Sequence, residues 1–146
     1  MKKIIILIPV FNDWQSLNKL LENINLNLSK LNFNISLIVV NDASNEKNTN
    51  DLNKFENIKP IKTINLIKNI GHARSIATGL KHIFEKEEFD YVIPMDGDGE
   101  DRPEEINNFL NLIKDNQNKA IVGERIKRSE NIIFKFCYSS HKIITQ

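Results

Sequence analysis

The sequence predicts an α/β protein with a Rossmann-like, mostly parallel sheet and helices on both faces. Short apolar runs alternate along the chain with longer segments of helical period, which is the order that parallel sheets require. Several of these runs are apolar at consecutive positions, which is typical of strands covered on both faces. Together the two observations favour a sheet with helical crossovers over a bundle or a β-sandwich.

The elements follow from the same pattern, taken in chain order. The apolar runs that predict strands are 3–10, 35–41, 61–67, 91–95 and 119–124. The segments with apolar residues at helical spacing are 14–31, 72–88 and 103–116. Pro103 suits the first position of the third helix, and Glu104 and Glu105 suit the positive end of its dipole. One short helix is expected in the polar loop 42–57, at 51–55.

Bulk properties limit the class of protein. A chain of 146 residues is expected to form one domain. Its 40% hydrophobic and 27% charged residues are typical of a globular protein, and a net charge of +1 gives no support for a nucleic-acid partner. A single cysteine, Cys137, excludes an internal disulfide and favours a cytoplasmic setting. No apolar stretch reaches the ~20 residues of a transmembrane helix.

Polar residues follow three of the predicted strands at their carboxyl ends. Asn12 and Asp13 follow the first strand, Asp42 follows the second, and Asp96 with Asp98 follows the fourth. Ligands of open α/β sheets bind beyond these ends, near a switch in strand order. We therefore expect the functional site at this edge.

The acidic turn after the fourth strand has two interpretations. Asp96 and Asp98 are two residues apart, so both can direct oxygens at one divalent cation. Without a cation, two carboxylates about 4 Å apart repel by roughly 1 kcal/mol in water and about 4 kcal/mol at an effective dielectric near 20. An exposed turn tolerates this repulsion, so a solvated loop before a helix is the alternative.

Two further stretches also allow two interpretations. Asp42 can accept a hydrogen bond from a base or ribose, or it can cap the following turn. The stretch 69–80 runs from a loop into a helix, where small residues and Arg74 favour a phosphate. Plain helix packing with a surface arginine explains it equally well. For His72, a capping or exposed position is preferred over a phosphate contact.

Four stretches occur in a fixed order: IPVFND (8–13), VVNDAS (39–44), NIGHARSIATGL (69–80) and MDGDGEDRPEEI (95–106). In order and spacing they resemble family 2 glycosyltransferases, especially the dolichyl-phosphate mannose synthase and polyprenyl-phosphate glycosyltransferase group. The resemblance implies a GT-A fold, with a nucleotide-sugar-binding domain at 1–128. The tail, 129–146, is then either amphipathic or a remnant of an acceptor half.

The resemblance also implies which residues bind the nucleotide sugar. Pro9 and the loop Asn12-Asp13 would lie against the nucleotide. Asp42 would bind the base. Gly71 and Arg74 would line the diphosphate side of the pocket.

A second group of residues is implied for the metal and the reaction. Asp96 would support the sugar or ribose and the metal, and Asp98 would be the principal ligand of Mg²⁺ or Mn²⁺. Glu100 is a third implied ligand, in a place where the lipid-phosphate-using members often have glutamine. Arg125, in the place of a family arginine, would act with Asp98 in catalysis by stabilising charge on the departing diphosphate.

The implied reaction is inverting transfer of a sugar from a UDP- or GDP-linked donor to a polyprenyl phosphate or a glycan, in cell-envelope glycan synthesis. This would place the protein in the cytoplasm or at the inner face of the membrane. Family members continue beyond this length with an acceptor half, so the enzyme is expected either to be a short form or to be completed by a second chain or a homo-oligomer. The alternative is a non-catalytic nucleotide-sugar-binding module or a truncated product. A receiver- or phosphatase-type metal domain centred on Asp42 ranks last.

Overall fold

The computed structural model describes residues 1–28, 33–99, 101–115 and 120–123. Its elements are β1 (Lys3–Val10), α1 (Trp14–Leu28), β2 (Asn34–Asn41), the 3-10 helix η1 (Leu52–Lys54), β3 (Ile61–Asn65), α2 (His72–Lys86), β4 (Tyr91–Pro94) and α3 (Pro103–Asp115). The first four predicted strands and all three predicted helices are confirmed, and η1 lies within the predicted short helix. The tail 129–146 lies outside the described residues. In the ranges described, no helix has the length and apolar character needed to span a membrane.

The four strands form one parallel sheet in the order β3-β2-β1-β4. β1 pairs with β2 on one side, where Ile4 faces Ile35, and with β4 on the other, where Ile4 faces Tyr91. Every residue of β1 from Ile4 to Ile8 is buried or nearly so. The consecutive apolar residues of this run therefore predict its central position correctly.

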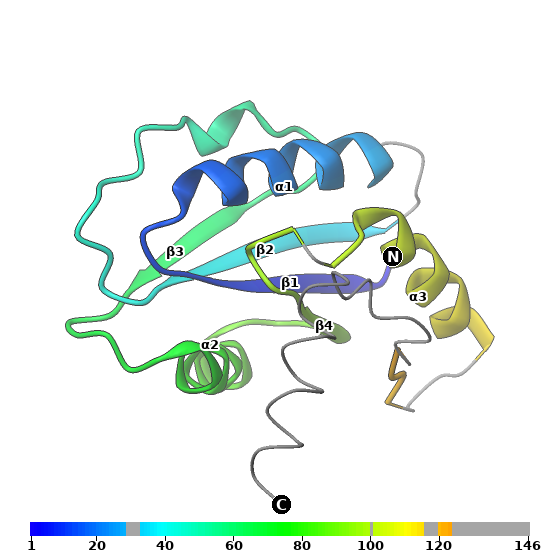
Figure 1. Ribbon diagram of the computed structural model, residues 1–146. Coiled ribbons are helices and arrows are strands. Elements are labelled where there is room, and N and C mark those ends of the chain that lie inside the picture. Colours follow the sequence, from blue (N-terminus) through cyan, green and yellow to red (C-terminus); the bar gives the residue numbers. More distant parts are fainter. Residues whose placement is uncertain (29–32, 100, 116–119, 124–146) are drawn as a thin grey trace, which may run out of the picture.

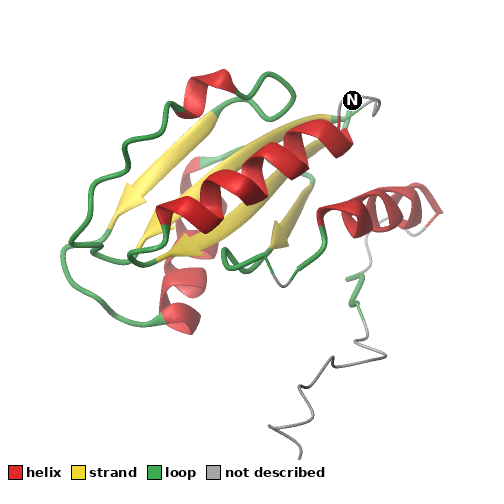
Figure 2. Cartoon of the chain, turned by 45° about the horizontal axis from the view of Figure 1, so that its top comes forward, coloured by secondary structure: helices red, strands yellow, loops and turns green. Residues whose placement is uncertain are grey.

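Helices cover both faces of the sheet, as predicted. α1 and α3 belong to the core cluster that contains Ile4, Ile6 and Ile8, whereas α2 packs with Ile5 and Leu7 on the opposite face. Figure 1 shows α1 and α2 on opposite sides of the strands, and Figure 2 shows α1 in front of the sheet with α2 behind it. The alternation of side chains along β1 thus divides the apolar core into two layers.

Helix α2 comes closest to the sheet at Gly79. A Cβ atom there would lie 2.5 Å from Cδ1 of Leu7 and 2.9 Å from Cγ2 of Val40. Ser75 and Ile83, one turn away on either side, are buried with it. Gly79 therefore supports the packing interpretation of the small residues in 69–80.

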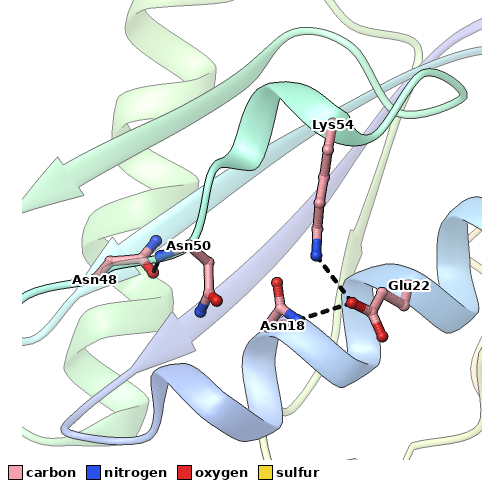
Figure 3. Close-up of polar contacts among 5 residues, drawn as sticks. All are labelled: Asn18, Glu22, Asn48, Asn50 and Lys54. Atoms are coloured by element: carbon pink, nitrogen blue, oxygen red, sulfur yellow. Dashed lines mark hydrogen bonds and ion pairs between the residues drawn. The ribbon is translucent and has the colours of Figure 1, made fainter.

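The long loop between β2 and β3 is fastened to α1 by side chains. Glu22 of α1 accepts hydrogen bonds at 2.9 Å from Nζ of Lys54 and from Nδ2 of Asn18 (Figure 3). Both bonds hold the pKa of Glu22 below its usual value, and the bond from Lys54 has the larger effect. Oδ1 of Asn25 also accepts the backbone N–H of Asn57 at 2.9 Å. The contacts hold η1 beside α1.

Two predicted strand segments differ from the structure. Residues 120–123, predicted within a strand at 119–124, have no strand structure. Val122 is 87% exposed while Ile121 packs against the core, so this segment contributes a side chain to the core instead of pairing with a sheet edge. The third strand ends at Asn65 instead of 67, because its partner β2 ends at Asn41, the residue opposite Asn65.

Candidate functional site

The strand order changes direction at β1, and this marks the candidate site. The chain moves outward from β1 to β2 and β3 and then returns to place β4 on the other side of β1. Ligands of parallel sheets bind in the crevice beyond the carboxyl ends of two such strands. A pocket of about 310 Å³ opens here, lined by Pro9, Val10, Phe11, Asp13, His72, Asp96, Gly97 and Asp98.

The β1 side of the pocket leads directly into helix α1. Oδ1 of Asp13 accepts a hydrogen bond from the backbone N–H of Ser16 at 3.1 Å, which satisfies one of the unpaired N–H groups at the start of the helix. Phe11 lies next to this cap and is 47% exposed. The β1 wall therefore presents apolar surface beside one carboxylate.

The β4 side comes close to β1 because residue 97 is glycine. A Cβ atom at Gly97 would lie 2.9 Å from the carbonyl oxygen of Pro9. The turn then folds back, and Oδ2 of Asp101 accepts the backbone N–H of Asp96 at 3.0 Å. Gly99 has a φ of 83°, in the left-handed region that favours glycine. This compact turn places Asp96 and Asp98 on the pocket wall.

His72 is exposed, as the sequence analysis preferred, but it also makes a contact that the sequence analysis did not predict. It is the first residue of α2, and its Nε2 lies 3.0 Å from Oδ1 of Asp96. Both side chains line the pocket. The available signal was topological: the start of α2 lies at the same edge of the sheet as the end of β4, so a polar first residue there is able to reach the acidic turn.

Asp42 has a different environment from the pocket carboxylates. Its side chain is buried, with 3% of the residue exposed, and its two oxygens accept the backbone N–H groups of Ile70 at 2.8 Å and Gly71 at 2.9 Å. Gly71 has a φ of 87°. Asp42 therefore holds the loop that leads into α2, and the predicted contact with a base stays a prediction.

Asn12 makes a similar link between the loops after β1 and β2. Its Oδ1 accepts the backbone N–H of Asn45 at 2.8 Å, and its own N–H donates to Oγ of Ser44 at 2.9 Å. The φ of Asn12 is 54°, a left-handed conformation that asparagine tolerates better than most residues. Side chains thus connect the loops after β1, β2 and β3 along the edge that carries the pocket.

The structure divides the predicted site residues into three groups. The pocket brings together Pro9, Asp13, Asp96 and Asp98. Asn12, Asp42, Gly71 and Arg74 lie at the same edge of the sheet but do not line this pocket, and Arg74 is exposed. Glu100 and Arg125 lie outside the described residues.

Carboxylates dominate the charge of the pocket. No lysine or arginine from the described ranges lines it. Within those ranges, no group of three or more His, Cys, Asp or Glu side chains forms a ready-made metal site. Mg²⁺, however, is commonly held by one or two carboxylates together with substrate phosphates and water. Asp96 and Asp98 therefore fit a cation that binds together with a diphosphate.

Comparisons with known proteins agree with this fold. Residues 5–140 match the profile of glycosyl transferase family 2. The structure of S. aureus TarS 1–349 superimposes with a TM-score of 0.60 at 20% sequence identity, covering 87% of this chain and 39% of that one. The structure of TarS 1–349 in complex with UDP-GlcNAc gives a TM-score of 0.60 at 19% identity, with 87% and 37% coverage. The predicted α/β fold of the GT-A type is confirmed by this likeness.

Relatives by sequence include proteins of the group that the motifs indicate. The undecaprenyl-phosphate 4-deoxy-4-formamido-L-arabinose transferase of Proteus mirabilis is 29% identical over 135 residues, 91% of this chain and 40% of that protein. The dolichol-phosphate mannosyltransferase of Pyrococcus furiosus is 27% identical over 125 residues, 86% of this chain and 34% of that protein. The chain thus spans well under half the length of these curated relatives. The family match over nearly the whole chain shows that this protein belongs to glycosyl transferase family 2.

Proposed function

We propose that this chain binds a nucleoside-diphosphate sugar in the pocket between β1 and β4 and serves glycosyl transfer from it. The observation that carries the proposal is the position of the pocket. It lies at the switch in strand order, with Asp96 and Asp98 on its β4 wall. Family membership and the TarS-like fold support the same site.

The charge of the pocket argues for a divalent cation. A diphosphate is an anion, and in this pocket it would lie beside the carboxylates of Asp13, Asp96 and Asp98. The described part of the chain adds no lysine or arginine to the lining. We propose that Asp98, assisted by Asp96, holds Mg²⁺ or Mn²⁺ and that Glu100 is a further ligand. Such a cation, when bound, neutralises charge on the diphosphate and polarises its oxygens.

The residues of the chain have separate proposed roles in the reaction. Pro9 and Phe11 supply an apolar wall, and the cap formed by Asp13 keeps the start of α1 fixed beside it. An acceptor oxygen attacks the anomeric carbon as the bond to the diphosphate breaks, which inverts the configuration without a protein nucleophile. We assign Arg125 to the charge that develops on the departing group.

The remaining nucleotide contacts are proposed around the pocket rim. Asp42 uses one acceptor site on each oxygen for Ile70 and Gly71, and each oxygen keeps a second lone pair for a base. Its burial makes that contact depend on movement of the loop. Arg74, exposed in the first turn of α2, and Gly71 are assigned to the diphosphate side.

The proposed acceptor is a polyprenyl phosphate. Two of the relatives reported above are named for transfer to undecaprenyl phosphate and dolichol phosphate. An acceptor of this kind would bring the chain to a membrane surface. A free glycan is the other acceptor to include in assays.

Calorimetric titration with UDP and GDP in the presence of Mn²⁺ tests the proposal. We expect binding of at least one nucleotide to the wild type and a loss of at least about 100-fold in affinity for Asp98→Asn, because removing a direct ligand should cost no less than removing an outer-shell partner, which costs about 10–100-fold. Glu105→Gln is the matched control, because Glu105 is acidic, exposed and near in sequence but does not line the pocket.

Absence of binding by either nucleotide with Mn²⁺ present contradicts the proposal. Binding with no transfer from the corresponding nucleotide sugar, to either acceptor, would instead match a nucleotide-sugar-binding module. Turnover that persists in Asp98→Asn would refute the role of that carboxylate.

A further inference from the structure

The contact between His72 and Asp96 joins two elements at the rim of the pocket. The backbone N–H of Asp96 donates to Asp101 within the same turn, and the Asp96 carboxylate contacts His72 at the start of α2. The two side chains are partly exposed, 57% for His72 and 42% for Asp96, so a ligand entering the pocket can reach them. Asp96 is therefore fixed at two points before any ligand binds.

This arrangement leaves Asp96 with capacity for a ligand. A carboxylate has two oxygens, and the contact with His72 uses Oδ1. A partly exposed aspartate without such a neighbour populates several rotamers, and binding a ligand must then restrict it to one of them. A contact that exists before binding lowers this entropic cost.

We infer that His72 is a positioning residue for Asp96, holding its carboxylate in the orientation that a nucleoside diphosphate and its divalent cation require. The inference rests on the proposed function, since it concerns the same pocket. His72 acts through Asp96 and is assigned no contact with the reacting atoms. Partners that orient metal-ligating side chains in this way change affinity when removed, even without touching the ligand.

Helix α2 provides a matched control for this role. His82 lies on the same helix, and its Nε2 is 3.6 Å from Oε1 of Glu87. It is the same residue type beside the same kind of group, but it does not line the pocket. A general effect of removing a histidine from α2 would therefore occur in both variants, whereas a positioning effect would occur only at His72.

The test is calorimetric titration of UDP and GDP, with Mn²⁺, into the wild type and the variants His72→Ala, His72→Gln, His82→Ala, Asp96→Asn and His72→Ala with Asp96→Asn. We expect His72→Ala to weaken binding about 10-fold and His82→Ala to leave it unchanged. His72→Gln should restore most of the affinity, because its side-chain amide keeps an N–H group of similar reach. The double variant should bind no more weakly than Asp96→Asn alone.

Thermal unfolding of each variant checks that the fold is retained, which we expect because His72 is largely exposed. The inference is overturned if His72→Ala binds as the wild type does, or if His72→Gln is no better than His72→Ala. It is also overturned if the effects of His72→Ala and Asp96→Asn multiply, since His72 would then contact the ligand independently. A wild type that binds neither nucleotide refutes the proposed function itself, and this inference with it.

Discussion

The charged side chains at the two ends of the central strands are arranged differently. Where β1 and β4 begin, lysines meet carboxylates: Nζ of Lys2 lies 3.2 Å from Oδ1 of Asp90, and the backbone N–H of Lys3 donates to Oδ2 of Asp90 at 2.7 Å. The Lys3 ammonium also pairs with Glu88, a hydrogen bond that raises the pKa of Lys3 and lowers that of Glu88. Charge at this edge is balanced within the protein.

Where the same strands end, the described part of the chain brings mostly carboxylates to the pocket. Asp13, Asp96 and Asp98 line the pocket with His72, and the described part of the chain adds no lysine or arginine to that lining. The difference agrees with our proposal that one edge fastens the sheet, whereas the other takes a ligand that brings its own cation. Both edges are exposed, so exposure alone does not explain the contrast.

Removal of divalent cations should have the largest effect. We expect nucleotide binding to weaken about 100-fold in EDTA, because each like-charge contact at about 4 Å costs between roughly 1 and 4 kcal/mol. Calorimetry with and without EDTA measures this effect. Equal affinities in the two buffers would show that the acidic edge does not depend on a cation. The unfolding temperature of the free chain serves as the control.

Loss of the buried carboxylate should have the next largest effect. Asp42→Ala leaves the N–H groups of Ile70 and Gly71 without their acceptor, so we expect the free energy of unfolding to fall by about 2–3 kcal/mol. Asp42→Asn keeps one oxygen acceptor and should lose less. Urea unfolding measures both variants. A loss in Asp42→Ala no greater than that in Asp90→Asn, at the exposed edge, would contradict this ranking.

A methyl group at the acidic turn should disturb the pocket more than the fold. Gly97→Ala places a Cβ atom 2.9 Å from the Pro9 carbonyl oxygen, so the turn after β4 must move away from β1. We expect about 1 kcal/mol less stability, at the low end for overpacking, together with weaker nucleotide binding. Urea unfolding and calorimetry on the same sample separate the two effects. Unchanged nucleotide affinity would show that this close approach is not needed.

The exposed ion pairs should contribute least, and their contribution should depend on pH. The hydrogen bond from Lys3 holds the pKa of Glu88 below its usual 4.5, and the Lys3 backbone N–H holds the pKa of Asp90 below its usual 3.8. A depressed pKa stabilises the folded state above the usual value, and this stability is lost as the pH falls through the folded-state pKa. Urea midpoints should therefore decrease below about pH 4.5, and less steeply in a Glu88→Gln, Asp90→Asn double variant. The same dependence of the urea midpoint on pH in the wild type and the double variant would show that these ion pairs do not stabilise the exposed edge.

Much of the fold was accessible from the sequence because burial leaves a pattern in it. The consecutive apolar residues of 3–10 are explained by a strand with helices on both faces, and Pro103 begins α3 where the capping preferences predict. The run 119–124 has only three consecutive aliphatic residues, 120–122, and only a partial structural counterpart. Composition indicates that a segment is apolar, whereas strand pairing depends on which sheet edge is near.

The position of the candidate pocket was predictable from the sequence, whereas the contacts around it were only partly predictable. Asp96 and Asp98 follow a buried strand at the expected edge, and both line the pocket. Asp42 follows a buried strand too, yet its oxygens are used by backbone N–H groups of a loop 28 and 29 residues further on. His72, in contrast, lines the pocket although the sequence did not predict a role for it there, because its partner Asp96 is distant in sequence. Contacts between separate loops depend on tertiary geometry that no local pattern encodes.

Paramagnetic broadening of backbone amide signals by Mn²⁺, with UDP or GDP present, tests the central claim most directly. The account predicts that broadening is strongest at residues 10–13, 72 and 96–98, where β1 and β4 end. Residues 2–3 and 88–90, at the opposite edge, should keep their signals. Broadening centred on that opposite edge, or none at the pocket with nucleotide and Mn²⁺ in excess, would contradict the claim that this pocket is the nucleotide-sugar site.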